Sequence, residues 1–118
     1  MMQIRENIPL KDLTTFHIGG PARFFVEVKT IDELGEALEF ARDRELPIFI
    51  LGGGSNLLVS DEGFDGLVIR PKFVGFEIKE NDDATASVRI ASGENWDSVV
   101  RRCVEAGLWG IENLSFIP

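Results

Sequence analysis

Apolar residues recur along the chain with two different periods, which predict two kinds of element. Between Thr30 and about Glu45 they recur every three or four positions, which predicts a helix with one apolar stripe. Thr30 and Glu33 form a capping-box pair at its start, where the hydroxyl accepts from one N–H and the carboxylate reaches back to another. A second helix is predicted over about 95–106, and Gly107 follows it as a helix-ending residue.

Shorter apolar runs around the first helix predict strands, at Ala22–Val28, Pro47–Leu51, Leu57–Val59 and Leu67–Ile69. Residues 74–79 and 84–91 alternate between apolar and polar and flank a turn at 81–83, so they predict an antiparallel hairpin. The first 21 residues give no clear pattern beyond a turn at Gly19-Gly20-Pro21. This order of elements predicts an α/β unit of the βαβ type, followed by a hairpin and a second helix.

Candidate chemistry is concentrated in the sequence Gly52-Gly53-Gly54-Ser55-Asn56, between two strands that we expect to be buried. Glycine has no Cβ, so it can adopt positive φ and approach a ligand closely. Successive N–H groups in such a bend can form a nest that binds an anion, and Ser55 and Asn56 add polar side chains. The stretch therefore predicts a phosphate or pyrophosphate site, although a turn that binds nothing explains the glycines equally well.

Two familiar phosphate loops do not fit this stretch. The dinucleotide fingerprint needs glycine at its first, third and sixth positions and then a helix, whereas Leu57 is sixth here and a strand is expected. The nucleoside-triphosphatase loop needs Gly-Lys-Ser/Thr, and no lysine lies between Lys29 and Lys72. The remaining interpretation is a strand–loop–strand cradle that binds through backbone amides.

Size and charge narrow the function classes. The 118 residues make about one domain, and the net charge of −8 disfavours a nucleic-acid partner. Cys103 is the single cysteine, so it has no internal disulfide partner, and its place on the apolar stripe predicts a buried residue rather than a nucleophile. His17 is the single histidine, and we expect it to have a local role. No stretch resembles a signal or a membrane span, so we expect a cytoplasmic location without a membrane partner.

Several stretches, taken in order, resemble the UDP-N-acetylenolpyruvoylglucosamine reductases, flavoenzymes of the vanillyl-alcohol-oxidase superfold. The matching stretches are Thr15–Ala22, Leu51–Ser60, Gly63–Gly66, Gly93–Trp96, Gly107–Leu114 and Ile117-Pro118. The resemblance spans nearly the whole chain, and the ordered set is far more specific than the glycines alone.

The resemblance implies an α+β fold, the beginning of an FAD-binding domain of the vanillyl-alcohol-oxidase (PCMH) type. Its first subdomain, a small mixed sheet with helices, would cover about 1–70, and the start of the second would cover about 71–118. FAD would lie extended between the two. The implied cofactor-binding residues are Leu51, Gly52, Gly53, Gly54, Ser55, Asn56, Leu57, Ile117 and Pro118.

For the intact enzyme, the resemblance implies reduction of the enolpyruvyl group of a UDP-sugar to UDP-N-acetylmuramate, with NADPH as hydride donor, in peptidoglycan synthesis. The family's catalytic arginine, serine and glutamate and its substrate domain lie beyond the matched segment, so we assign no catalytic residue and no metal ligand here. We interpret the chain, with its apolar end at 114–118, as a fragment.

Alone, this fragment is expected to be inactive and to bind FAD weakly or not at all, because a shared site has lost one wall. Apolar surface around Leu114, Phe116 and Ile117 is expected to promote self-association. Two other functions remain open: another flavin oxidase of the same superfold, or a small non-catalytic α/β binding module.

Overall fold

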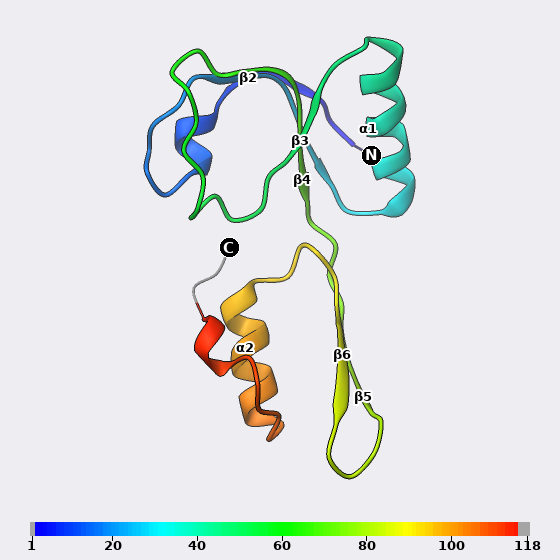
Figure 1. Ribbon diagram of the computed structural model, residues 1–118. Helices are drawn as coiled ribbons and strands as arrows, with labels where there is room; N and C mark the ends of the chain where they lie inside the picture. The colour runs from blue at the N-terminus through cyan, green and yellow to red at the C-terminus, as the bar shows by residue number, and fades with distance from the viewer. Residues whose placement is uncertain (1, 116–118) are drawn as a thin grey trace.

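Two β-sheets organise the computed structural model, which describes residues 2–115. The elements in chain order are β1 Arg5–Pro9, η1 Leu10–Leu13, β2 Pro21–Val28, α1 Ile31–Asp43, β3 Ile48–Ile50, β4 Phe64–Pro71, β5 Phe76–Glu80, β6 Ala86–Ile90, α2 Trp96–Glu105 and η2 Glu112–Leu114, where η marks a short 3-10 helix. The larger sheet has the order β1-β2-β4-β3, and β5 and β6 form the smaller one. Figure 1 shows α1 beside the larger sheet and α2 beside the smaller. The α+β class is confirmed.

The core of the larger sheet forms around its two central strands, β2 and β4, which run parallel. Central parallel strands are covered on both faces, and here both faces are apolar. One buried cluster joins β2 and β4 to Ala37 and Ala41 of α1. A second cluster contains Leu10, Phe25 and Leu51. The predicted strands at Ala22–Val28, Pro47–Leu51 and Leu67–Ile69 are therefore confirmed, each with small differences in its bounds.

Helix α1 begins as its sequence predicts. The hydroxyl of Thr30 accepts from the Glu33 N–H at 3.1 Å. The Glu33 carboxylate reaches back to the N–H of Lys29 at 2.6 Å, one residue earlier than a standard capping box. The helix ends at Asp43 rather than near Glu45.

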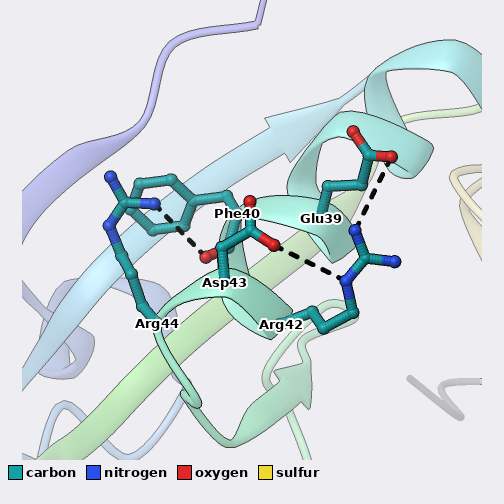
Figure 2. A network of polar contacts seen from close by, with 5 residues as sticks. All are labelled: Glu39, Phe40, Arg42, Asp43 and Arg44. Carbon is teal, nitrogen blue, oxygen red and sulfur yellow. Dashed lines mark hydrogen bonds and ion pairs between the residues drawn. The ribbon is translucent and has the colours of Figure 1, made fainter.

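The last turn of α1 carries a small network of polar contacts (Figure 2). Arg42 lies 3.9 Å from Glu39 and 3.5 Å from Asp43, while Arg44 donates to the Phe40 carbonyl and covers its ring at 3.9 Å from the centroid. Both ion pairs are largely exposed, so water and salt weaken them and they contribute little to stability.

The strand expected at Leu57–Val59 is absent, and residues 57–60 have no regular structure. Leu57 and Val59 are instead partly buried and pack against the second cluster, which contains Leu10 and Phe25. Their apolar run therefore reflects the packing of a loop and not a sheet ladder. The expectation of two buried strands around the glycines is wrong as well, since β3 is an edge strand with exposed side chains.

The hairpin and the second helix are confirmed. β5 and β6 pair antiparallel, with Ile78 opposite Val88. Helix α2 is capped by Asn95, whose side chain accepts from the Ser98 N–H at 3.0 Å, and Cys103 is buried on its inner side. Among residues 2–115, neither α-helix has the length and apolar content that a membrane crossing requires.

Candidate cofactor site

The candidate site is the glycine loop, which we define as Gly52–Asn56. It leaves the larger sheet at a fixed point, because Leu51 is only 2% exposed and its N–H donates to the Ile69 carbonyl at 2.9 Å. Beyond this anchor the loop runs on the surface, where only Gly54 is buried. Leu51 therefore supports the loop from the core, whereas the residues that a ligand can reach lie after it.

Gly54 is a glycine for reasons internal to the protein. Its φ is +75°, in the region that favours glycine. A Cβ at Gly54 would collide with the Leu13 carbonyl oxygen and lie 3.0 Å from the Thr14 Cα. The Gly54 carbonyl also accepts from the Thr15 N–H at 3.0 Å. Of the three glycines, this one alone has positive φ, and it fastens the loop to the segment at 13–15.

Gly52 and Gly53 are different, because nothing in the described chain requires them to be glycine. Both are exposed, neither has positive φ, and a Cβ at either position would meet no atom within 4 Å. A glycine that faces open space at such a site allows a ligand to approach the backbone closely. These two positions are therefore where the loop is most accessible to an anion.

The N–H groups of the glycine loop, from Gly52 to Asn56, make no hydrogen bond within the described chain. The side chains of Ser55 and Asn56 are exposed as well. Successive backbone donors without internal acceptors are the groups from which an anion nest is built. The sequence-predicted residues at 52–56 thus lie together and present donors, while Ile117 and Pro118 fall outside the described residues.

Apolar hollows lie beside this row of donors. One, of about 210 Å³, is lined by the loop itself together with Phe49 and Ile50. The other, of about 190 Å³, lies next to it, between Leu10, Leu58 and Phe64. None of the described residues that line either hollow is charged. An anion held here would be bound by main-chain donors, and the apolar walls suit a ligand that also carries a flat ring.

A brace that sequence reasoning missed holds the following segment, 57–63, in place. The Gly20 N–H donates to the Ser60 carbonyl at 2.8 Å, and a Cβ at Gly19 would lie 2.6 Å from the Val59 Cβ. A Cβ at Gly63 would collide with the Pro21 carbonyl. Gly19-Gly20-Pro21 is predicted from sequence only as a turn. Its glycines in fact permit close packing against residues about forty positions away.

The chain is similar to known FAD-binding proteins. The family model described as "FAD binding domain" matches residues 22–118. UDP-N-acetylenolpyruvoylglucosamine reductase of Thermobifida fusca is 46% identical over 113 residues, which are 96% of this chain and 32% of that protein. The enzyme of the same name from Pseudomonas syringae pv. syringae is 38% identical over 117 residues, covering 99% of this chain and 34% of that protein. The chain thus spans about a third of these relatives.

A solved structure shows the same likeness. The crystal structure of UDP-N-acetylenolpyruvylglucosamine reductase from Thermus caldophilus superimposes with a TM-score of 0.73 at 34% identity. The match covers 100% of this chain and 39% of that one. The resemblance seen in the sequence is therefore confirmed, and so is FAD as the cofactor of the matched family.

Proposed function

Because this chain belongs to the FAD binding domain family, we propose that it is the part of a UDP-N-acetylenolpyruvoylglucosamine reductase that holds the FAD pyrophosphate. The observation that carries this proposal is the glycine loop, whose N–H groups at 52–56 have no acceptor in the described chain. The open space over Gly52 and Gly53 lets two linked phosphates come close enough to reach them. The adjoining apolar hollows would receive flatter parts of the cofactor.

The residues of the site have distinct tasks in this proposal. The loop amides bind the pyrophosphate, and Ser55 and Asn56 add hydrogen bonds to phosphate oxygens. Leu51 fixes the start of the loop, and Gly54 fixes its middle while its N–H remains one of the loop amides. Leu57 contributes an apolar wall to both hollows. Ile117 and Pro118 are proposed to contact the cofactor from the second subdomain.

In the intact enzyme, FAD would supply the transfer of hydride from NADPH to the enolpyruvyl double bond of the UDP-sugar, and a proton added to the neighbouring carbon would complete the reduction to UDP-N-acetylmuramate. We assign this cytoplasmic step of peptidoglycan synthesis to the parent protein and no catalytic residue to this chain. A boundary near residue 70 would divide the chain into a first subdomain and the start of a second. With one wall of the shared site missing, the chain alone binds FAD weakly, has no reductase turnover, and self-associates through its apolar residues from Leu114 onward, of which Phe116 and Ile117 lie outside the described residues.

The loop's role is tested on the 118-residue chain by NMR titration with inorganic pyrophosphate and with FAD. We expect the amide signals of Gly52–Asn56 to shift, with dissociation constants in about the millimolar range. Gly53→Val should abolish the shifts, because its side chain fills the space over the loop. Gly35→Val is the matched control: Gly35, on the exposed side of α1, also has no atom within 4 Å of its Cβ position, and this variant should titrate normally.

Two results would contradict the proposal. Loop amides that do not respond to either probe at concentrations well above the millimolar range would show that the bend is only a turn. Equal responses of the parent and Gly53→Val would show that the ligand binds elsewhere on the chain.

A further inference from the structure

Thr14 has a buried hydroxyl without a hydrogen-bond partner. The residue is only 4% exposed, and its Oγ1 bonds to no atom of the described chain. Among residues 2–115 it is the buried polar residue of the core. A buried hydroxyl without a partner costs free energy, so such a group in a native fold calls for an explanation.

The place of Thr14 in the fold suggests one. Its Cα lies 3.0 Å from the Cβ position of Gly54, so its backbone lies directly against the glycine loop. The neighbouring Thr15 N–H already donates to the Gly54 carbonyl at 3.0 Å. The Thr14 carbonyl is occupied by the His17 N–H at 3.3 Å, which holds this segment in a tight turn. The hydroxyl is thus an unused polar group in a segment that is otherwise bonded to the loop.

The geometry of a peptide unit links this hydroxyl to an anion at the loop. The N–H and C=O of one peptide point in opposite directions, so amides that converge on an anion turn carbonyls toward the protein. The Gly54 carbonyl is one example, because it turns toward the segment at 13–15 and accepts from the Thr15 N–H. Further carbonyls that turn inward need donors, and a threonine hydroxyl is one.

We propose that Thr14 is a positioning residue of the glycine loop, whose hydroxyl donates to a loop carbonyl when the amides hold a pyrophosphate. This inference rests on the proposed function. Without ligand, the unpaired hydroxyl destabilises the fold. With pyrophosphate bound, its hydrogen bond to the loop carbonyl stabilises the complex. A hydroxyl with a purely structural role would instead stabilise both states equally.

The test compares Thr14→Val, which keeps the shape and removes the hydroxyl, with Thr14→Ser, which keeps the hydroxyl. The probe is inorganic pyrophosphate on the 118-residue chain, and each variant is also melted without ligand. We expect Thr14→Val to melt at the same temperature as the parent or higher, yet to bind pyrophosphate about tenfold more weakly. Thr14→Ser should bind within a few-fold of the parent. Ser92→Ala, which removes an exposed hydroxyl from the turn before α2, is the control and should change neither quantity.

The outcomes separate the two proposals. If the parent chain binds pyrophosphate and Thr14→Val binds it equally well, the role of Thr14 is refuted while the proposed function stands. If Thr14→Val lowers the melting temperature and the affinity together, the hydroxyl is structural and the inference also fails. A parent whose loop does not respond to pyrophosphate overturns the proposed function and this inference with it.

Discussion

At the scale of single residues, the three glycines of the loop have unequal roles. Gly54 fits a space that Leu13 and Thr14 leave only for a hydrogen atom, and its φ is positive. Gly52 and Gly53 face open space. A substitution at Gly54 should therefore lower the stability of the fold, whereas one at Gly52 or Gly53 should weaken ligand binding and leave the fold intact.

Gly54→Ala should destabilise the chain by about 2 kcal/mol or more, since the new Cβ meets backbone at a positive φ. Gly52→Ala, at an open position with ordinary φ, should change stability by less than about 0.5 kcal/mol. Urea denaturation followed by circular dichroism measures both values. Equal free energies of unfolding for the two variants would show that the packing of Gly54 against Leu13 contributes nothing.

The sequence drew attention to the candidate site, whose role stays a prediction, but it gave no sign of the contacts that support the loop. The residues at 52–56 can be recognised from their types alone, because adjacent glycine, serine and asparagine favour a loop that binds an anion through its backbone. The contacts from Leu13–Thr15 to Gly54, and from Gly20 to Ser60, join residues about forty positions apart. Local sequence carries no signal for such a pairing, so neither the brace nor the burial of Thr14 could be predicted.

At the scale of elements, the apolar patterns in the sequence predicted those helices and strands that form through the packing of their side chains. The hairpin and both α-helices have regular apolar periods and were found. β1 was missed because only Ile8 among its residues is partly buried, so main-chain pairing with β2 forms this strand. Leu57–Val59 was assigned wrongly as strand because the packing of a loop on the core also selects consecutive apolar residues.

The hairpin turn should depend on pH through Asp82. Hydrogen bonds from the N–H groups of Ala84 and then Thr85 hold the pKa of Asp82 below its ordinary value of 3.8. Since the folded-state pKa is depressed, the carboxylate stabilises the turn above about pH 4, and this contribution disappears as the pH falls through the folded-state pKa. Hydrogen exchange of the Ala84 and Thr85 amides should therefore speed up in acid, relative to unfolded controls at the same pH. Asp82→Asn keeps an acceptor oxygen but cannot titrate, and unchanged acid sensitivity in this variant would refute the role of Asp82.

At the scale of the whole molecule, the part around the larger sheet has an enclosed core, whereas the part around the smaller sheet is open. The larger sheet encloses two apolar clusters with α1 and the loops. Within the described residues the smaller sheet has two strands, and an open groove lies between β6 and α2, with Val88, Trp96 and Cys103 among the residues that line it. This asymmetry supports the proposed division into one subdomain and the start of another, in relatives about three times as long.

The most direct test restores that length. We would join this chain to the remaining two thirds of the Thermobifida fusca reductase, which is 46% identical over the matched part, and measure flavin absorbance per protein after gel filtration. We expect a yellow protein with about one FAD per chain, the same for the Gly35→Val control, and a folded, colourless protein for Gly53→Val. A folded but colourless parent, or full flavin content in Gly53→Val, would contradict the claim that the amides of the glycine loop bind the pyrophosphate of FAD.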